Sequence, residues 1–130
     1  MTKKHNLSAL EWEIMEVIWN IDGEPSVRQV LETAYPNGEK AYTTVQTVMN
    51  NLENKGFLKK EKIGLVNFYQ PQKKKDEIVS KETGNFVRKV FNGSFQALAN
   101  YIIASDSLSD EEIADLKKMI DEYERERGKK

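Results

Sequence analysis

The sequence predicts a mainly α-helical fold that contains one small β-hairpin. Apolar residues recur at helical spacing along most of the chain, and two capping-box patterns mark helix starts. Two short segments on either side of Gly64 are typical of strands joined by a glycine turn. Turn residues divide the first part of the chain into three helices followed by this hairpin. That order is typical of a winged helix-turn-helix domain, in which the hairpin is the wing.

The first two predicted helices are short and have clear boundaries. Ser8 and Glu11 fit a capping box, so the first helix should begin at Ser8 and end near Gly23. The second should begin near Ser26 and stop before Pro36. A tight helix pair of this kind can hold a third helix against a groove.

The third predicted helix, residues 41–56, has two different faces. Its apolar residues recur at i, i+3, i+4 and i+7, and they are Val45, Val48, Met49 and Leu52. The opposite face carries short, neutral, hydrogen-bonding side chains, namely Thr43, Gln46, Thr47, Asn50, Asn51 and Asn54. An ordinary solvated face uses Glu and Lys, which are better helix formers. Asn and Gln can bond an adenine edge and Thr can contact thymine, so the pattern favours a DNA-reading helix. The alternative is a surface helix of an all-α domain whose polar face has no partner.

The hairpin is expected directly after this helix. Gly56 stands where a helix C-terminus requires a positive φ. Residues 57–62 and 66–70 are typical of strands, and Pro71 closes the second.

Positive charge is concentrated in one part of the chain. Residues 40–75 contain eight lysines and two acids, a balance of +6, whereas the whole chain has a net charge of −1. Phosphate contact requires such a local patch. The lysines expected to contact phosphates are Lys40, Lys55, Lys59, Lys60 and Lys62.

The run from Gln72 to Lys75 predicts a hinge between two parts. The first part, residues 1–72, would be the winged-helix DNA-binding domain, and residues 73–130 would form a helical segment.

The C-terminal segment predicts three helices. The apolar stripe of the first is interrupted at Thr83-Gly84, and Asn92-Gly93 ends that helix. Short helices with single apolar stripes do not easily bury those stripes alone. We therefore expect a homodimer whose interface contains Val79, Phe86, Val90, Phe91, Phe95, Leu98, Ile102, Ile113, Leu116 and Ile120.

Composition narrows the possible functions. The chain has no cysteine, which excludes disulfides, thiolate metal sites and a cysteine nucleophile. Its single histidine, His5, lies in the expected flexible terminus, and we expect no metal, cofactor or enzymatic activity. No apolar run reaches the length of a membrane span and no signal peptide is apparent, so the sequence predicts a cytoplasmic protein.

Several motifs resemble the family of penicillinase and methicillin-resistance repressors, which also includes copper-responsive repressors. They are Thr44-Val45-Gln46-Thr47 followed by Leu52 and Lys55-Gly56, Tyr69-x-Pro71, and an opening helix with Glu11-Trp12 and Trp19. The resemblance covers the chain from about Leu7 to Tyr123. It implies a winged helix, a C-terminal dimerisation segment, and repression by binding a palindromic operator in double-stranded DNA.

The same resemblance implies roles for individual residues. The recognition positions correspond to Thr43, Thr44, Gln46, Thr47, Asn50 and Asn51. Family members often carry Arg where this chain has Asn51, and frequently a basic residue near Gln46. The operator sequence of those members therefore does not carry over to this chain. The copper branch binds metal through C-terminal cysteines, which this chain lacks.

For the antibiotic-responsive branch, the resemblance implies release by proteolysis from a membrane-bound metalloprotease sensor. Asn100-Tyr101 resembles the cleavage site, with Tyr where those members have Phe.

Two other function classes stay open at this stage. A winged helix can serve protein–protein assembly without binding DNA, and the acidic first 39 residues and Asn51 favour that reading. A regulator that responds to a small molecule is the other alternative, although no polar cluster suited to a ligand is visible in the sequence.

Overall fold

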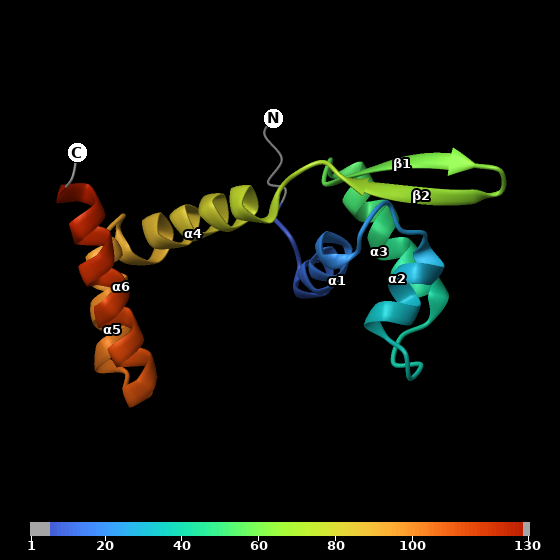
Figure 1. The fold of residues 1–130 in the computed structure, drawn as a ribbon. Coiled ribbons are helices and arrows are strands. Elements are labelled where there is room, and N and C mark those ends of the chain that lie inside the picture. The colour runs from blue at the N-terminus through green and yellow to red at the C-terminus, as the bar shows by residue number, and fades with distance from the viewer. Residues whose placement is uncertain (1–5, 129–130) are drawn as a thin grey trace. The chain divides into compact units, whose positions relative to one another are not determined.

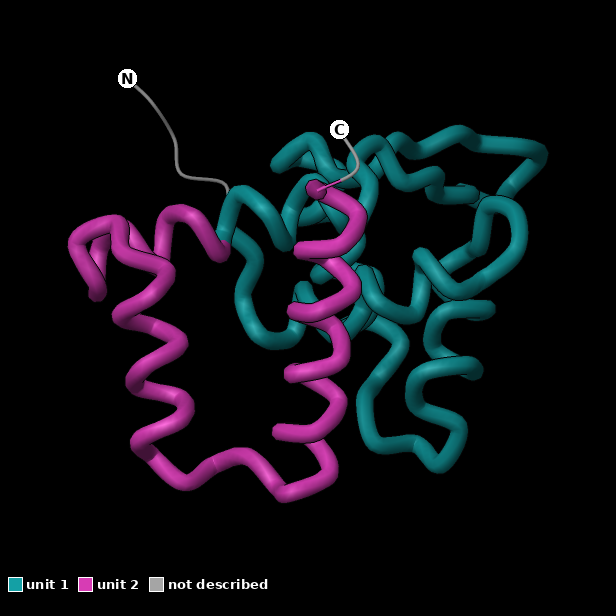
Figure 2. The backbone as a smooth tube through the Cα atoms, turned by 60° about the vertical axis from the view of Figure 1, so that its left-hand side comes forward, with its two compact units in different colours: residues 1–82 teal, residues 83–130 magenta. Residues whose placement is uncertain are grey.

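The computed structural model describes residues 6–128, so His5 lies outside the described residues. Two compact units divide the chain, residues 1–82 and residues 83–130 (Figure 2). No helix within the described residues is long and apolar enough to cross a membrane.

Helices α1 (Ala9–Asn20) and α2 (Val27–Ala34) begin where the sequence predicts. The Ser8 hydroxyl accepts a hydrogen bond from the Glu11 backbone N–H at 3.2 Å, and the Glu11 carboxylate accepts one from the Ser8 N–H at 2.8 Å. This reciprocal pair satisfies two N–H groups that the start of a helix leaves unpaired. Ser26 caps α2 in the same position, accepting from the backbone N–H of residue 29.

Helix α3 spans Tyr42–Asn54 and shows the two predicted faces. Its buried residues are Val45, Val48, Met49 and Leu52. Gly56 has φ +88°, a conformation that costs glycine little, and it turns the chain directly into the hairpin.

The hairpin consists of β1 (Leu58–Ile63) and β2 (Val66–Pro71), paired antiparallel. A single bridge joins Ser26 to Phe68, and the Tyr69 N–H donates to the Pro25 carbonyl at 2.9 Å. The second strand is therefore tied to the segment just before α2. Figure 1 shows α1, α2 and α3 gathered on one side of the hairpin, which confirms the predicted winged helix-turn-helix order.

One hydrophobic core serves the first unit. It joins the inner faces of the three helices to the first residues of the hairpin, and Ile14, Met15, Ile18, Val30, Val45, Met49 and Leu52 are almost fully buried in it. Ile78, from the start of α4 (Lys75–Phe91), belongs to the same core. Trp12 Nε1 donates to Glu82 at 3.3 Å and Trp19 Nε1 donates to the Lys73 carbonyl at 3.0 Å. These contacts explain why unit 1 extends past residue 72 to Glu82.

The interruption of the apolar stripe at Thr83-Gly84 does not end the helix, because α4 continues through both residues. A glycine inside a helix costs only about 1 kcal/mol relative to alanine, so it weakens a helix without ending it. The break at Asn92-Gly93 is confirmed: both residues have positive φ, and α4 ends at Phe91.

The second unit contains the end of α4 with α5 (Phe95–Ala104) and α6 (Asp110–Gly128). Ser109 forms a capping box with Glu112 at the start of α6. All of α5 and α6 lies within the described residues, and neither helix contains a buried residue.

Candidate nucleic-acid interface

The outer face of α3 presents hydroxyl and amide groups to solvent. Thr43, Gln46, Thr47 and Asn51 are exposed, whereas Thr44 and Asn50 are half-buried. All six lie within four turns of one helix, and the buried face of that helix is fixed in the core. Hydroxyl and amide groups held on a rigid helix are among the groups that can read base edges in the major groove.

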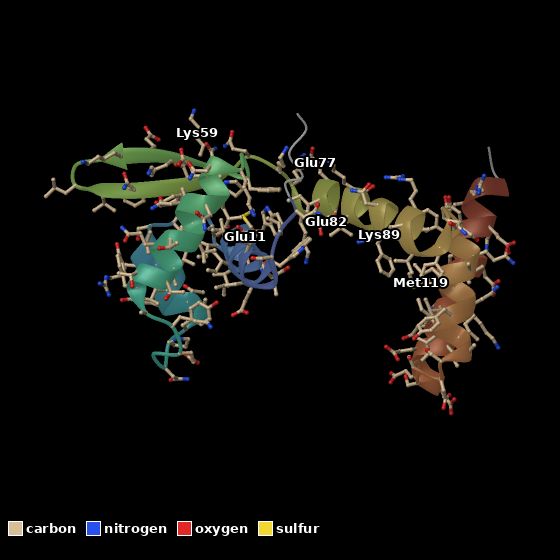
Figure 3. All side chains as sticks on the ribbon, turned by 180° about the vertical axis from the view of Figure 1, so that it is seen from behind. Glu11, Lys59, Glu77, Glu82, Lys89 and Met119 are labelled. Atoms are coloured by element: carbon tan, nitrogen blue, oxygen red, sulfur yellow. The ribbon has the colours of Figure 1, made fainter. Side chains whose placement is uncertain are left out.

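The hairpin places lysines beside this helix. Lys59, Lys60 and Lys62 are exposed on β1, and Lys40 is exposed shortly before α3. Side chains alternate between the two faces of a strand. The side chains of Lys60 and Lys62 therefore lie on the same face of the hairpin as buried Leu58, and the side chain of Lys59 lies on the opposite face. Figure 3 labels Lys59 on the hairpin. These ammonium groups can neutralise phosphates on either side of a base-reading helix.

Lys55 has a different position from the other predicted phosphate contacts. Its ammonium lies 2.8 and 2.9 Å from the two carboxylate oxygens of Glu11 and 3.3 Å from the Asn6 carbonyl. An ammonium has three N–H donors, and these contacts use all of them. The structure therefore gives Lys55 a role inside unit 1, and we leave it out of the proposed DNA contacts.

The Glu11–Lys55 pair joins the start of α1 to the end of α3. Glu11 is only 5% exposed and is labelled in Figure 3. Burial disfavours its charged form, but hydrogen bonds from Lys55 and Ser8 and the charge of Lys55 outweigh this effect. The pKa of Glu11 is consequently lowered below its ordinary value of 4.5.

Replacing Lys55 by Met should lower the free energy of unfolding by about 1–3 kcal/mol at pH 7, because a nearly buried carboxylate loses its cation. Since the folded state lowers the pKa of Glu11, the pair stabilises the fold above pH 4.5. That contribution is lost as the pH falls through the folded-state pKa. Urea unfolding of both proteins at pH 7 and at pH 3.5 measures the difference, which should shrink at the lower pH.

Lys75→Met is the matched control for this measurement. Lys75 pairs with Glu16 at 2.8 Å, but both side chains are nearly half exposed. Solvent screening and the entropy of ordering two long side chains leave such an exposed pair little net stabilising effect, so this variant should lose much less stability than Lys55→Met. An equal loss of stability in both variants would show that the burial of Glu11 does not increase the stabilising effect of its ion pair.

Sequence reasoning missed one side chain at this face. Tyr69, on β2, donates its hydroxyl to the side-chain oxygen of Asn50 at 2.9 Å. Lys60 Nζ lies 3.5 Å from the same oxygen. The sequence signals for Tyr69 are its place at an inward position of the second strand and its part in the Tyr69-x-Pro71 motif, and neither indicates a contact with Asn50.

With this geometry established, comparison with known proteins decides the family. A family model described as penicillinase repressor matches residues 7–122. The chain belongs to the penicillinase repressor family. The family resemblance seen in the motifs is thereby confirmed.

Individual relatives align along nearly their whole length. The methicillin resistance regulatory protein MecI of Staphylococcus aureus is 27% identical over 118 residues, which cover 91% of this chain and 95% of that protein. The penicillinase repressor of Bacillus licheniformis is 27% identical over 123 residues, covering 95% of each chain. The penicillinase repressor of Staphylococcus aureus is 25% identical over 122 residues, covering 92% and 94%.

Membership defines the class of activity. The protein is a transcriptional repressor and not an enzyme. The hydroxyl and amide face of α3 and the lysines of β1 are the parts of this chain suited to that activity.

Proposed function

We propose that the protein is a homodimeric cytoplasmic repressor that binds a palindromic operator with two copies of α3. One observation carries the proposal: an exposed face of hydroxyl and amide groups lies beside a hairpin strand that bears three exposed lysines. In a two-fold dimer, the two recognition helices would enter major grooves about one helical turn, or a small multiple of it, apart.

The two groups of side chains have separate roles in this proposal. Lys40, Lys59, Lys60 and Lys62 neutralise phosphates and fix the position of the protein on the duplex. Thr43, Thr44, Gln46, Thr47, Asn50 and Asn51 distinguish the bases, and each good contact is worth about 1–3 kcal/mol of discrimination.

Exposed apolar side chains on a single chain support the dimer. Phe86, Val90, Phe95 and Ile120 are each about half exposed or more, and Val79, Ile113 and Leu116 are about 40% exposed. Phe91, Leu98 and Ile102 are partly buried within the chain. A second copy of the chain would cover these surfaces and stabilise both copies by removing apolar area from water.

Cleavage within α5 would be a route to derepression. Asn100 is exposed and Tyr101 is 62% exposed, so a protease could reach this bond once the helix opens locally. The cut would separate α6 from the rest of the chain, and we propose a membrane-bound metalloprotease sensor as the agent. A chain ending at Asn100 that dimerised and bound its operator normally would contradict this mechanism.

Fluorescence anisotropy with the duplex upstream of the protein's own gene tests the function, with a scrambled duplex beside it at two salt concentrations. We expect tighter binding to the native duplex than to the scrambled duplex at both salt concentrations. Thr47→Ala should reduce the preference for the native duplex. Lys62→Ala should weaken binding to both duplexes alike and lower the slope of log K against log salt by about 1.

The outcomes separate the remaining alternatives. Equal binding to both duplexes that higher salt removes would show a basic surface without sequence reading. Absence of binding to either would favour the protein–protein interaction module. An identical, uniform loss in both variants would contradict the division of roles between α3 and β1.

A further inference from the structure

We propose that Tyr69 is a positioning residue that turns the side-chain amide of Asn50 so that it offers only N–H donors to DNA. The inference rests on the proposed function, since it concerns how α3 reads a base. It also changes the expectation for Asn50, because a freely rotating Asn can bond adenine through one donor and one acceptor.

Two donors from the hairpin meet the same atom of Asn50. The Tyr69 hydroxyl donates to Oδ1 at 2.9 Å, and Lys60 Nζ lies 3.5 Å from that oxygen. Lys60 and Tyr69 are direct cross-strand partners, so their side chains leave the hairpin on the same face. An ammonium has no acceptor, so the amide atom that faces it is the oxygen. The amide nitrogen must then point the other way.

The phenol is held firmly enough to fix this orientation. Tyr69 is 1% exposed, and its backbone N–H donates to the Pro25 carbonyl at 2.9 Å. Burial raises the pKa of Tyr69, and the nearby acidic groups of Glu53 and Tyr42 raise it further. The hydroxyl therefore stays protonated at neutral pH and remains a donor to Asn50.

The orientation limits what Asn50 can recognise. Within the described residues its Nδ2 group donates no hydrogen bond, so both N–H groups are available to a ligand, while Oδ1 is occupied. Guanine offers two acceptors, N7 and O6, in the major groove, whereas the adenine edge requires one donor and one acceptor from the protein. Asn50 should accordingly favour guanine over adenine at the base pair that it faces.

Selection of bound duplexes from a randomised pool, followed by sequencing, tests this assignment on the full-length protein. The wild type should enrich a motif with guanine at one position in each half-site. Tyr69→Phe removes the hydroxyl and frees Oδ1. Adenine should then gain about fivefold or more relative to guanine at that position, while the preferences at the other positions stay unchanged.

Two controls separate orientation from general loss of structure. Tyr35 is also buried, but its hydroxyl bonds Glu13 at 2.6 Å, so Tyr35→Phe should leave the motif unchanged. In an Asn50→Ala background, Tyr69→Phe should produce no further change in base preference. Asn50→Asp keeps the acceptor for Tyr69 but has no N–H donor, so it should lose the guanine preference even if Tyr69→Phe does not fold.

Each outcome has a distinct meaning. An unchanged motif in folded Tyr69→Phe, or a guanine preference that survives in Asn50→Asp, would overturn the role of Tyr69 and leave the repressor function standing. A wild type that enriches no motif would overturn sequence reading itself, and this inference with it.

Discussion

Replacing Leu116 and Ile120 together by glutamate should make the repressor monomeric and weaken its binding to the operator about 100-fold or more. Both residues lie on α6, and in the single chain they are 40% and 59% exposed. Glutamates at these positions stay hydrated in the monomer, but a dimer interface would have to bury two unpaired charges from each copy. A monomer would contact only one half-site. In a dimer, binding of one copy holds the other at a high effective concentration near the second half-site, and the monomer loses this gain. Sedimentation velocity measures the assembly, and anisotropy measures operator affinity.

Lys118→Glu is the control for this experiment. It also adds negative charge to α6, but at a position roughly opposite the apolar stripe of the helix. The control should remain dimeric and bind DNA normally. Thermal unfolding of the double variant should show an intact first unit, because that unit ends at Glu82. A double variant that still sediments as a dimer would place the interface somewhere other than the exposed face of α6.

Local sequence signals were sufficient to predict most of the first unit. The helix starts at Ser8 and Ser26 depend on hydrogen bonds that span only three residues, so a sequence pattern reports them directly. The two faces of α3 follow from helical periodicity, and the turn at Gly56 follows from the ease with which glycine adopts positive φ.

Contacts between distant residues could not be predicted in this way. Lys55 looked like one more cation of the basic segment, but it binds Glu11, which lies 44 residues earlier in the sequence. Tyr69 reaches Asn50 only because the hairpin folds back over α3. Neither pair lies at helical or strand spacing, and only the packing of separate elements shows which groups meet.

The helical C-terminal segment shows which local signals end a helix. Thr83-Gly84 interrupts the apolar stripe and glycine is a poor helix former, yet α4 is continuous across both residues. One unfavourable residue is outweighed by the hydrogen bonds and good helix formers on both sides. Asn92-Gly93 does end the helix, because two consecutive residues there adopt positive φ.

Leu52→Ala should lower the free energy of unfolding by about 2–5 kcal/mol, the usual range for removing a buried leucine side chain from a close-packed core. Leu52 has no exposed surface and belongs to the core that holds α3 against the other helices. For a unit of this size the midpoint of thermal unfolding should fall by about 10 °C or more. Calorimetry or circular dichroism measures the fall.

Asn51→Ala provides the matched comparison, because Asn51 is the preceding residue and lies on the exposed face of α3. Its effect on the free energy of unfolding should stay within about 0.5 kcal/mol, since a surface substitution removes no core contact and alanine is a good helix former. Asn51→Ala should nevertheless change the base preference more than Leu52→Ala does. At a temperature where both variants are folded, Leu52→Ala should retain the wild-type motif and Asn51→Ala should not. If Asn51→Ala bound DNA like the wild type while Leu52→Ala changed the motif, the assignment of one face of α3 to the core and the other to DNA would be wrong.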